Sequence, residues 1–181
     1  MMSNYRQKFI NLNKTLWSEI AIKKDVVIVE GRPFINQMIA SSFAAKAIQE
    51  VKKIPAVIWL SSKEDKDIYQ SFSIEKMVNK KEYILLHLFY ILPNVVYTVF
   101  KSVIELAISK NRIEYFIDFY KVEGIRLGDL IYDTYIRNDL SFLNPKLCSI
   151  KFLKIYIFTI IEFYSIKHFF KKNNVKFAVV S

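Results

Sequence analysis

The sequence predicts an α/β protein built on a small, parallel, Rossmann-like sheet of about three strands with a large helical insertion. Three observations predict this fold: a strand–helix–strand pattern over 26–61, a glycine-free apolar segment over 74–120, and a final apolar run over 175–181. A chain of 181 residues can form one domain with its own core, and 52% apolar residues argue against disorder. We therefore expect a single α/β domain over 1–181.

The first strand is expected at VVIVE, residues 26–30, because a β-branched run that ends at a glycine suits a strand buried on both faces. Apolar residues then recur at helical spacing from Ile35 to Val51. Pro55 breaks the helix, and AVIWL, residues 56–60, forms a second apolar run. This order predicts a parallel strand pair with a right-handed crossover.

The segment from Ile74 to Tyr120 is expected to form two or more helices, divided near Pro93. Within it, residues 83–100 are 18 consecutive residues without Asp, Glu, Lys or Arg, which is the lower limit for a membrane span. Three lysines flank this run: Lys80, Lys81 and Lys101. Because Pro93 and His87 lie inside it, a buried or interfacial helix pair is favoured over a spanning helix.

The formal net charge is +10, from 27 basic and 17 acidic residues. A solvated lysine surface, an anionic membrane face and a nucleic-acid surface are all compatible with this charge. The lysines come in scattered pairs rather than along one element, and no zinc-finger, RRM or basic-zipper spacing occurs. We therefore expect no nucleic-acid partner, and a possible partner at the inner-membrane surface.

Cysteine and histidine usage indicates a cytoplasmic protein without a metal site. The one cysteine, Cys148, allows no internal disulfide and suits a reducing compartment. His87 and His168 lie far apart in the sequence, without a cluster of cysteines or carboxylates. The first 14 residues lack the apolar stretch of a secretory signal.

The stretch GIRLGDLIYDTYIRN, residues 124–138, holds two of the three glycines and two of the five arginines. Gly124 and Gly128 bracket a short loop. Glycine permits positive φ and close approach of backbones, which a β-branched residue forbids. We therefore expect a tight turn that leads into a helix start.

After the second glycine the residues fall at helical spacing. Asp129, Asp133 and Arg137 share one face, and Asp133 can form an i,i+4 ion pair with Arg137. By spacing alone, a capped amphipathic helix with a surface ion pair is favoured over a ligand site. Two like charges four residues apart, with Tyr132 beside them, favour a site for hydroxyls or phosphate. The Walker lysine and the full GxGxxG pattern are both missing.

The stretch Gly124–Arg137 resembles a Gly-Ile-x-x-Gly-Asp-Leu-Ile-Tyr-Asp-x-Tyr-x-Arg pattern of bacterial proteins of surface and capsular polysaccharide biosynthesis, which are identified as glycosyltransferases. VVIVEGR followed by a helix is also similar to the start of such proteins. The resemblance is specific only over Gly124–Arg137. It implies a two-domain, GT-B-like enzyme with two Rossmann-type halves, of which this chain is an incomplete N-terminal, acceptor-side half.

The resemblance singles out six residues: Gly124, Gly128, Asp129, Tyr132, Asp133 and Arg137. Because ligands of open α/β sheets bind outside the carboxyl ends of the strands, Glu30 and Arg32 join them. Glu30 or Asp129 is the candidate base that activates an acceptor hydroxyl, and Arg32 or Arg137 is the candidate group that steadies phosphate charge. The position of Glu30 at a strand end favours it as the base. An ordinary loop carboxylate that pairs with Arg32 explains the presence of Glu30 equally well.

The resemblance also sets the expected partners. A sugar or lipid-linked acceptor binds this chain, whereas the nucleotide-sugar donor binds the other half of the intact enzyme, so no cofactor is expected here. The last run, 175–181, stops where a ligand-binding loop is expected, which predicts an N-terminal part of a longer enzyme. The alternative is a non-catalytic, membrane-associated protein anchored by helix 83–100.

Overall fold

The computed structural model describes residues 2–17, 25–31, 34–60, 66–108, 113–138 and 149–179. The chain divides into two compact units, each described by itself below. Unit 1 comprises Met1–Leu86 and His168–Ser181, and unit 2 comprises His87–Lys167. Two long helices, α4 (Lys80–Ile108) and α7 (Ile150–Asn173), contribute residues to both units.

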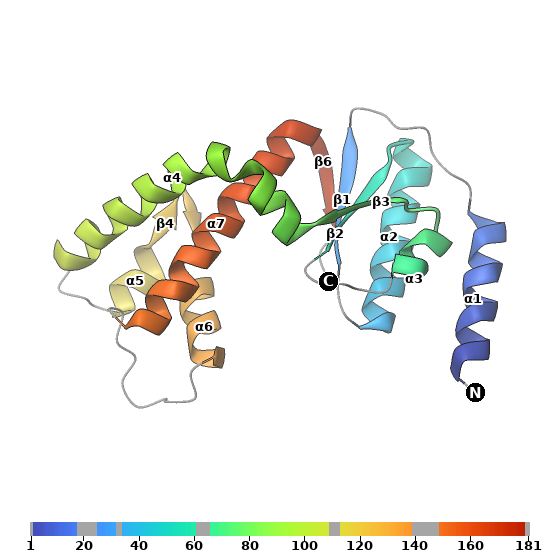
Figure 1. The fold of residues 1–181 in the computed structure, drawn as a ribbon, viewed down its shortest axis with the longest axis horizontal. Helices are drawn as coiled ribbons and strands as arrows, with labels where there is room; N and C mark the ends of the chain where they lie inside the picture. Colours follow the sequence, from blue (N-terminus) through green and yellow to red (C-terminus); the bar gives the residue numbers. More distant parts are fainter. Residues whose placement is uncertain are drawn as a thin grey trace. The chain divides into compact units, whose positions relative to one another are not determined.

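Unit 1 is an α/β structure with a parallel sheet, as the sequence predicts. Its other elements are α1 (Met2–Leu16), β1 (Val26–Glu30), α2 (Ile35–Lys52), β2 (Ala56–Leu60), α3 (Lys66–Ser71), β3 (Lys76–Asn79) and β6 (Val175–Val179). Within the described residues the sheet has four strands in the order β3-β2-β1-β6, all parallel (Figure 1). The same order opens a Rossmann sheet: the chain steps outward from β1 to β3 and then returns to the other side of β1.

The fourth strand, β3, corrects the prediction of about three strands and of an entirely helical 74–120 segment. Lys76–Asn79 has only two apolar residues and is too short to show an alternating pattern. It becomes a strand because its backbone pairs with β2 from Val57↔Lys76 to Leu60↔Asn79. Asn79 then ends the strand and caps α4, since its Oδ1 accepts hydrogen bonds from the backbone N–H groups of Lys81 at 2.9 Å and Glu82 at 3.3 Å.

Both faces of the sheet in unit 1 are covered, which explains its continuous apolar strands. On one face Val27, Val29 and Ile58 are fully buried in a core with Met38 and Ala45 of α2. On the other face Trp59 meets the rings of Tyr83 and Phe169 in edge-to-face contacts, with centroids 5.3 and 5.1 Å away. The first turn of α4 and the last turns of α7 therefore close the second face.

Unit 2 combines the rest of α4 and α7 with α5 (Ile113–Phe119), the hairpin β4–β5 and α6 (Gly128–Asn138). The hairpin strands are Lys121–Val122 and Ile125–Arg126. The predicted division near Pro93 is wrong, because α4 runs through this proline without interruption. Pro93 is exposed, while Ile91 and Val95 on either side are buried, so packing compensates for the one helical hydrogen bond that proline cannot make.

A buried chain of hydroxyl groups joins the elements of unit 2. The Ser102 hydroxyl donates to the Thr98 carbonyl at 2.7 Å and lies 2.8 Å from the Tyr120 hydroxyl, which lies 2.7 Å from the Tyr156 hydroxyl. Since each hydroxyl has one proton, Tyr156 donates to Tyr120 and Tyr120 donates to Ser102. A second bond, 2.8 Å long, joins Thr98 of α4 to Tyr164 of α7.

The buried tyrosines make the fold sensitive to alkali. Burial raises the pKa of Tyr120 and Tyr156 above that of an exposed phenol, and it raises the pKa of Tyr83 to about 12. The unfolded chain loses these protons from about pH 10, whereas the folded chain keeps them. The stability that they contribute is therefore fully present below pH 10 and is lost as the pH rises above that value.

We predict that the free energy of unfolding in urea falls as the pH is raised above about 10, and that Tyr120→Phe flattens this fall by up to about 1.4 kcal/mol per pH unit. Tyr5→Phe, at an exposed position of α1, is the control and keeps the wild-type slope. Equal slopes for Tyr120→Phe and the wild type would contradict the role given to the buried phenol.

Candidate functional site

The carboxyl edge of the parallel sheet is the first candidate site. The chain order reverses at β1, which has β2 on one side and β6 on the other, and ligands of open α/β sheets bind at such a switch point. Glu30 is the last residue of β1, is half-buried, and lies opposite Trp59 in the register with β2. Sheet topology therefore places the predicted base, Glu30, at the position where α/β proteins bind ligands.

Gly31, the next residue, keeps the chain close to β2. Its N–H donates to the Trp59 carbonyl at 2.8 Å. A Cβ at this position would lie 2.9 Å from Cδ2 of Leu60 and 3.0 Å from the Trp59 carbonyl oxygen, so a larger residue would displace its neighbours. Arg32 lies outside the described residues, and its proposed pairing with Glu30 stays a prediction.

The glycine motif belongs to unit 2 and begins at the turn of the β4–β5 hairpin. Glu123 and Gly124 occupy the turn with φ values of 50° and 84°. Positive φ at both central residues is the requirement of a type I′ hairpin turn, and glycine meets it without steric cost. Gly124 thus has the positive φ for which a glycine was expected in the motif. The expected loop between Gly124 and Gly128 is wrong in part, because Ile125 and Arg126 pair with Val122 and Lys121 as strand β5.

Gly128 meets the other expectation, a close approach of two backbones. A Cβ here would lie 1.9 Å from the carbonyl oxygen of Phe116, a distance no real side chain adopts. The start of α6 therefore rests directly on the end of α5. Ile131 and Tyr135 are buried further along α6, and the Tyr135 ring meets Phe152 of α7 edge-to-face with centroids 5.5 Å apart.

The charged residues of the motif form two separate ion pairs. Asp129 accepts hydrogen bonds from Arg126 through Nη2 at 2.7 Å and Nε at 3.2 Å, and also from the backbone N–H of Leu130 at 2.9 Å. The predicted pair of Asp133 and Arg137 is confirmed, with Nη2 2.9 Å from Oδ2. Each aspartate has its own arginine, which relieves the repulsion between the two carboxylates.

These contacts separate the two candidate bases. The hydrogen bonds from Arg126 and Leu130 lower the pKa of Asp129, which makes this carboxylate a poorer proton acceptor than an ordinary one. Glu30 is therefore the better candidate. Glu30 belongs to unit 1, whereas Asp129, Asp133 and Arg137 belong to unit 2, so neither unit by itself contains all the predicted residues.

Asp133 and Arg137 lie on the solvent-facing side of α6, where their side chains are 54% and 76% exposed. Tyr132 beside them is half-buried. An exposed ion pair of this kind contributes little to stability. By geometry alone, α6 matches the amphipathic helix with a surface ion pair that the residue spacing favours. Any ligand-binding role of these three residues stays a prediction.

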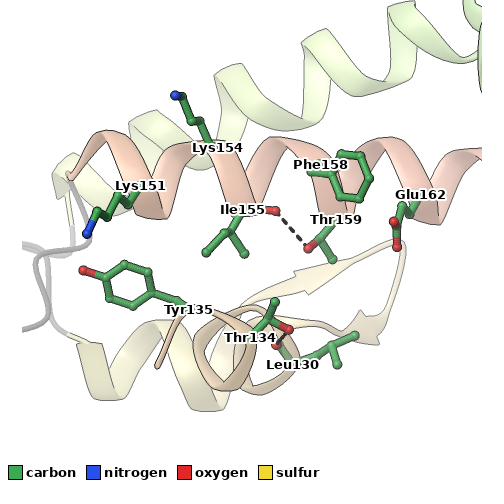
Figure 2. A pocket seen from close by; sticks show the side chains of 9 residues that line it. All are labelled: Leu130, Thr134, Tyr135, Lys151, Lys154, Ile155, Phe158, Thr159 and Glu162. Carbon is green, nitrogen blue, oxygen red and sulfur yellow. Dashed lines mark hydrogen bonds between the residues drawn. The ribbon is translucent and has the colours of Figure 1, made fainter. Parts of the chain in front are cut away.

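Unit 2 also contains an open groove of about 670 Å³ between α6 and α7, shown in Figure 2. Leu130, Thr134 and Tyr135 line it from α6. From α7 it is lined by Lys151, Lys154, Ile155, Phe158, Thr159 and Glu162. Figure 2 shows Ile155 pointing toward α6, with Lys151 at the Tyr135 end, Glu162 at the other end, and Lys154 directed away from α6.

The groove is mainly apolar, because its two threonine hydroxyls are occupied locally. Thr134 donates to the Leu130 carbonyl at 2.8 Å, and Thr159 donates to the Ile155 carbonyl at 2.9 Å. The motif helix that carries Leu130 and Thr134 was predicted from the sequence, but the groove was missed. In the sequence, the groove is indicated only by Lys151, Ile155 and Thr159, which follow one another four residues apart on the later helix. This spacing does not show which helix they face.

In the parts of the chain that the structure describes, no three His, Cys, Asp or Glu side chains gather as metal ligands. Comparison with protein-family models, curated proteins and solved structures finds no match to this chain. The resemblance over Gly124–Arg137 therefore stays a prediction.

Substitution of the two motif glycines separates their roles. We predict that Gly124→Ala lowers the free energy of unfolding by about 1 to 2 kcal/mol, the cost of a left-handed backbone in an alanine. Gly128→Ala should lower it by more, because the new methyl group would overlap the Phe116 carbonyl.

Chemical denaturation of both variants measures this order. Gly124→Asn is the matched control and should lose less than Gly124→Ala, since asparagine tolerates positive φ. A Gly128→Ala protein as stable as Gly124→Ala would show that α5 and α6 do not touch at this point.

Proposed function

We propose that this chain is the acceptor-side domain of a glycosyltransferase of surface polysaccharide biosynthesis. The observation that carries the proposal is the position of Glu30 at the switch point of a Rossmann-like sheet. A carboxylate there can take the proton of an acceptor hydroxyl. The resemblance of Gly124–Arg137 supplies the class of reaction.

In the proposed reaction Glu30 removes the hydroxyl proton while the acceptor oxygen attacks the anomeric carbon of a nucleotide sugar. The bond from that carbon to the diphosphate breaks, and the nucleoside diphosphate leaves with the bonding electrons. Arg32 of unit 1 or, alternatively, Arg137 of unit 2 is the candidate group for steadying phosphate charge, since a guanidinium can bind phosphate with two parallel hydrogen bonds.

Taken by itself, unit 2 has in the groove between α6 and α7 a surface that suits the hydrocarbon chain of a lipid-linked molecule. Leu130, Ile155 and Phe158 offer an apolar wall to a hydrocarbon chain, and Lys151 stands at one end, where a phosphate could bind. A groove of about 670 Å³ lies within the usual size of a small-molecule site.

A second candidate function is a non-catalytic, membrane-associated protein anchored by residues 83–100. The observation that favours it is the large number of exposed apolar side chains on α4. Both candidates place α4 at a membrane, so membrane binding does not distinguish them. A change that removes only the proton-accepting ability of Glu30 does.

We predict that Glu30→Gln, in the bacterium that carries the gene, lowers the rate of surface polysaccharide synthesis about a hundredfold or more. The amide keeps the shape of the side chain but accepts no proton. Glu50→Gln is the matched control, because Glu50 is an exposed carboxylate paired with Lys53 on the surface. Polymer is measured after replacing the chromosomal copy, with protein levels checked by immunoblot.

The outcomes separate the candidates. Normal polymer after complete deletion of the gene would overturn the glycosyltransferase proposal. Loss of polymer on deletion, with normal synthesis in Glu30→Gln, would reject the base and favour the non-catalytic candidate.

A further inference from the structure

The exposed face of α4 is more apolar than its buried stripe. The buried stripe mixes polar His87, Thr98 and Ser102 with apolar Ile91 and Val95. The exposed face is apolar and aromatic, and includes Leu86, Phe89, Val96, Tyr97, Phe100 and Ile104. A helix on the surface of a water-soluble protein instead carries polar and charged residues on its exposed face.

The exposed face is too apolar to be left in water. Phe89 is 89% exposed and Phe100 is 68% exposed, three turns further along the same helix. Among the described residues, α4 is the one helix long and apolar enough to cross a membrane, and only 22% of its most apolar window is buried. A contiguous apolar patch of this kind marks a surface that something else covers.

Charge and aromatic placement favour lipid over protein as the cover. The run from Tyr83 to Phe100 contains no charged residue, while Lys80, Lys81 and Glu82 precede it and Lys101, which pairs with Glu105, follows it. Basic residues at the ends of an apolar helix suit an anionic leaflet, and the net charge of +10 adds to this attraction. Tyr90 and Tyr97, seven residues apart, lie at one border of the apolar face, where tyrosine suits the headgroup region.

The packing of α7 decides how α4 enters the membrane. Thr98 bonds to Tyr164 of α7, and Ser102 is linked to Tyr156 of α7 through Tyr120. Lys154 and Glu162 lie within two residues of these tyrosines. If α4 crossed the bilayer, α7 and these two charged residues would enter the hydrocarbon with it, which is costly.

We infer that α4 lies in the plane of one leaflet of an anionic membrane, with its Phe89–Phe100 face at the boundary of the acyl chains and its hydroxyl-bearing face on α7. Membrane association belongs to both candidate functions above, and the inference rests on it but not on sugar transfer. The chemistry recognised is an anionic lipid surface rather than a single lipid species.

Sedimentation with vesicles tests the surface, using the full chain and either phosphatidylcholine alone or a mixture with phosphatidylglycerol. Binding should be stronger to the anionic mixture and weaken as salt is raised. Phe89→Glu and Phe100→Glu should each lower the partition coefficient about tenfold or more. Tyr5→Glu is the matched control, because Tyr5 is 70% exposed on α1 and should leave partition unchanged. Circular dichroism confirms that the variants fold.

Spin-label depth measurements on bound vesicles test the orientation. Cys148→Ser removes the native thiol, and single labels are then placed by Leu86→Cys, Phe89→Cys, Val96→Cys, Phe100→Cys and Ile104→Cys. A helix in the plane gives all five labels a similar depth of roughly 5 to 10 Å. A depth that peaks at position 96 and falls toward both ends would establish a spanning helix and overturn the inference.

A chain that binds neither kind of vesicle would also overturn it, and would indicate a protein partner for the apolar face. These results are independent of Glu30. A failed polymer test with normal shallow insertion rejects only the chemistry, whereas failed insertion with a normal polymer test rejects only the membrane surface.

Discussion

The packing of α4 against α7 in unit 2 depends on the chain of hydrogen-bonded hydroxyl groups from Tyr156 through Tyr120 to Ser102. Hydroxyl groups buried without partners would destabilise the unit, so their mutual bonds fix the rotation of α4 about its axis against α7. With this rotation the apolar residues of the opposite face, among them Phe89 and Phe100, are exposed in the part of the chain that the structure describes. The buried hydroxyl groups and the apolar exterior of α4 are therefore two results of one packing arrangement.

Unit 1 follows the opposite and more familiar rule. Its strands bury Val27, Val29 and Ile58 under α2, and Trp59 on the other face. A sheet covered on both faces can bind ligands only at its ends, and the reversal of chain order at β1 selects the carboxyl edge, where Glu30 lies. The proposed chemistry thus lies at the edge of the sheet where the chain order reverses, while the inferred membrane surface is the exposed face of α4.

The sequence was most informative where a residue is required by local geometry. The strand–helix–strand unit, the last strand, the need for glycines in the motif and the Asp133–Arg137 pair were predicted, because each depends on spacing or on the stereochemistry of one residue. The β4–β5 hairpin around Gly124 was not predicted. The strand β3 was missed because only its pairing with β2 makes four weakly apolar residues a strand. The continuity of α4 through Pro93 was missed for a similar reason: burial of Ile91 and Val95 outweighs the proline, and that burial is supplied by distant residues.

The candidate site shows the same limit more sharply. Glu30 could be named from its place after a strand, but its position at a switch point follows from β6, some 145 residues later in the chain, pairing beside β1. The groove could not be named at all, since Leu130 and Ile155 meet only through tertiary packing. Asp129 was a reasonable candidate for a base until its contacts with Arg126 and the Leu130 amide lowered its pKa. A carboxylate held by such donors is suited to fixing the start of α6, so the case against Asp129 as the base comes from its partners rather than from its residue type.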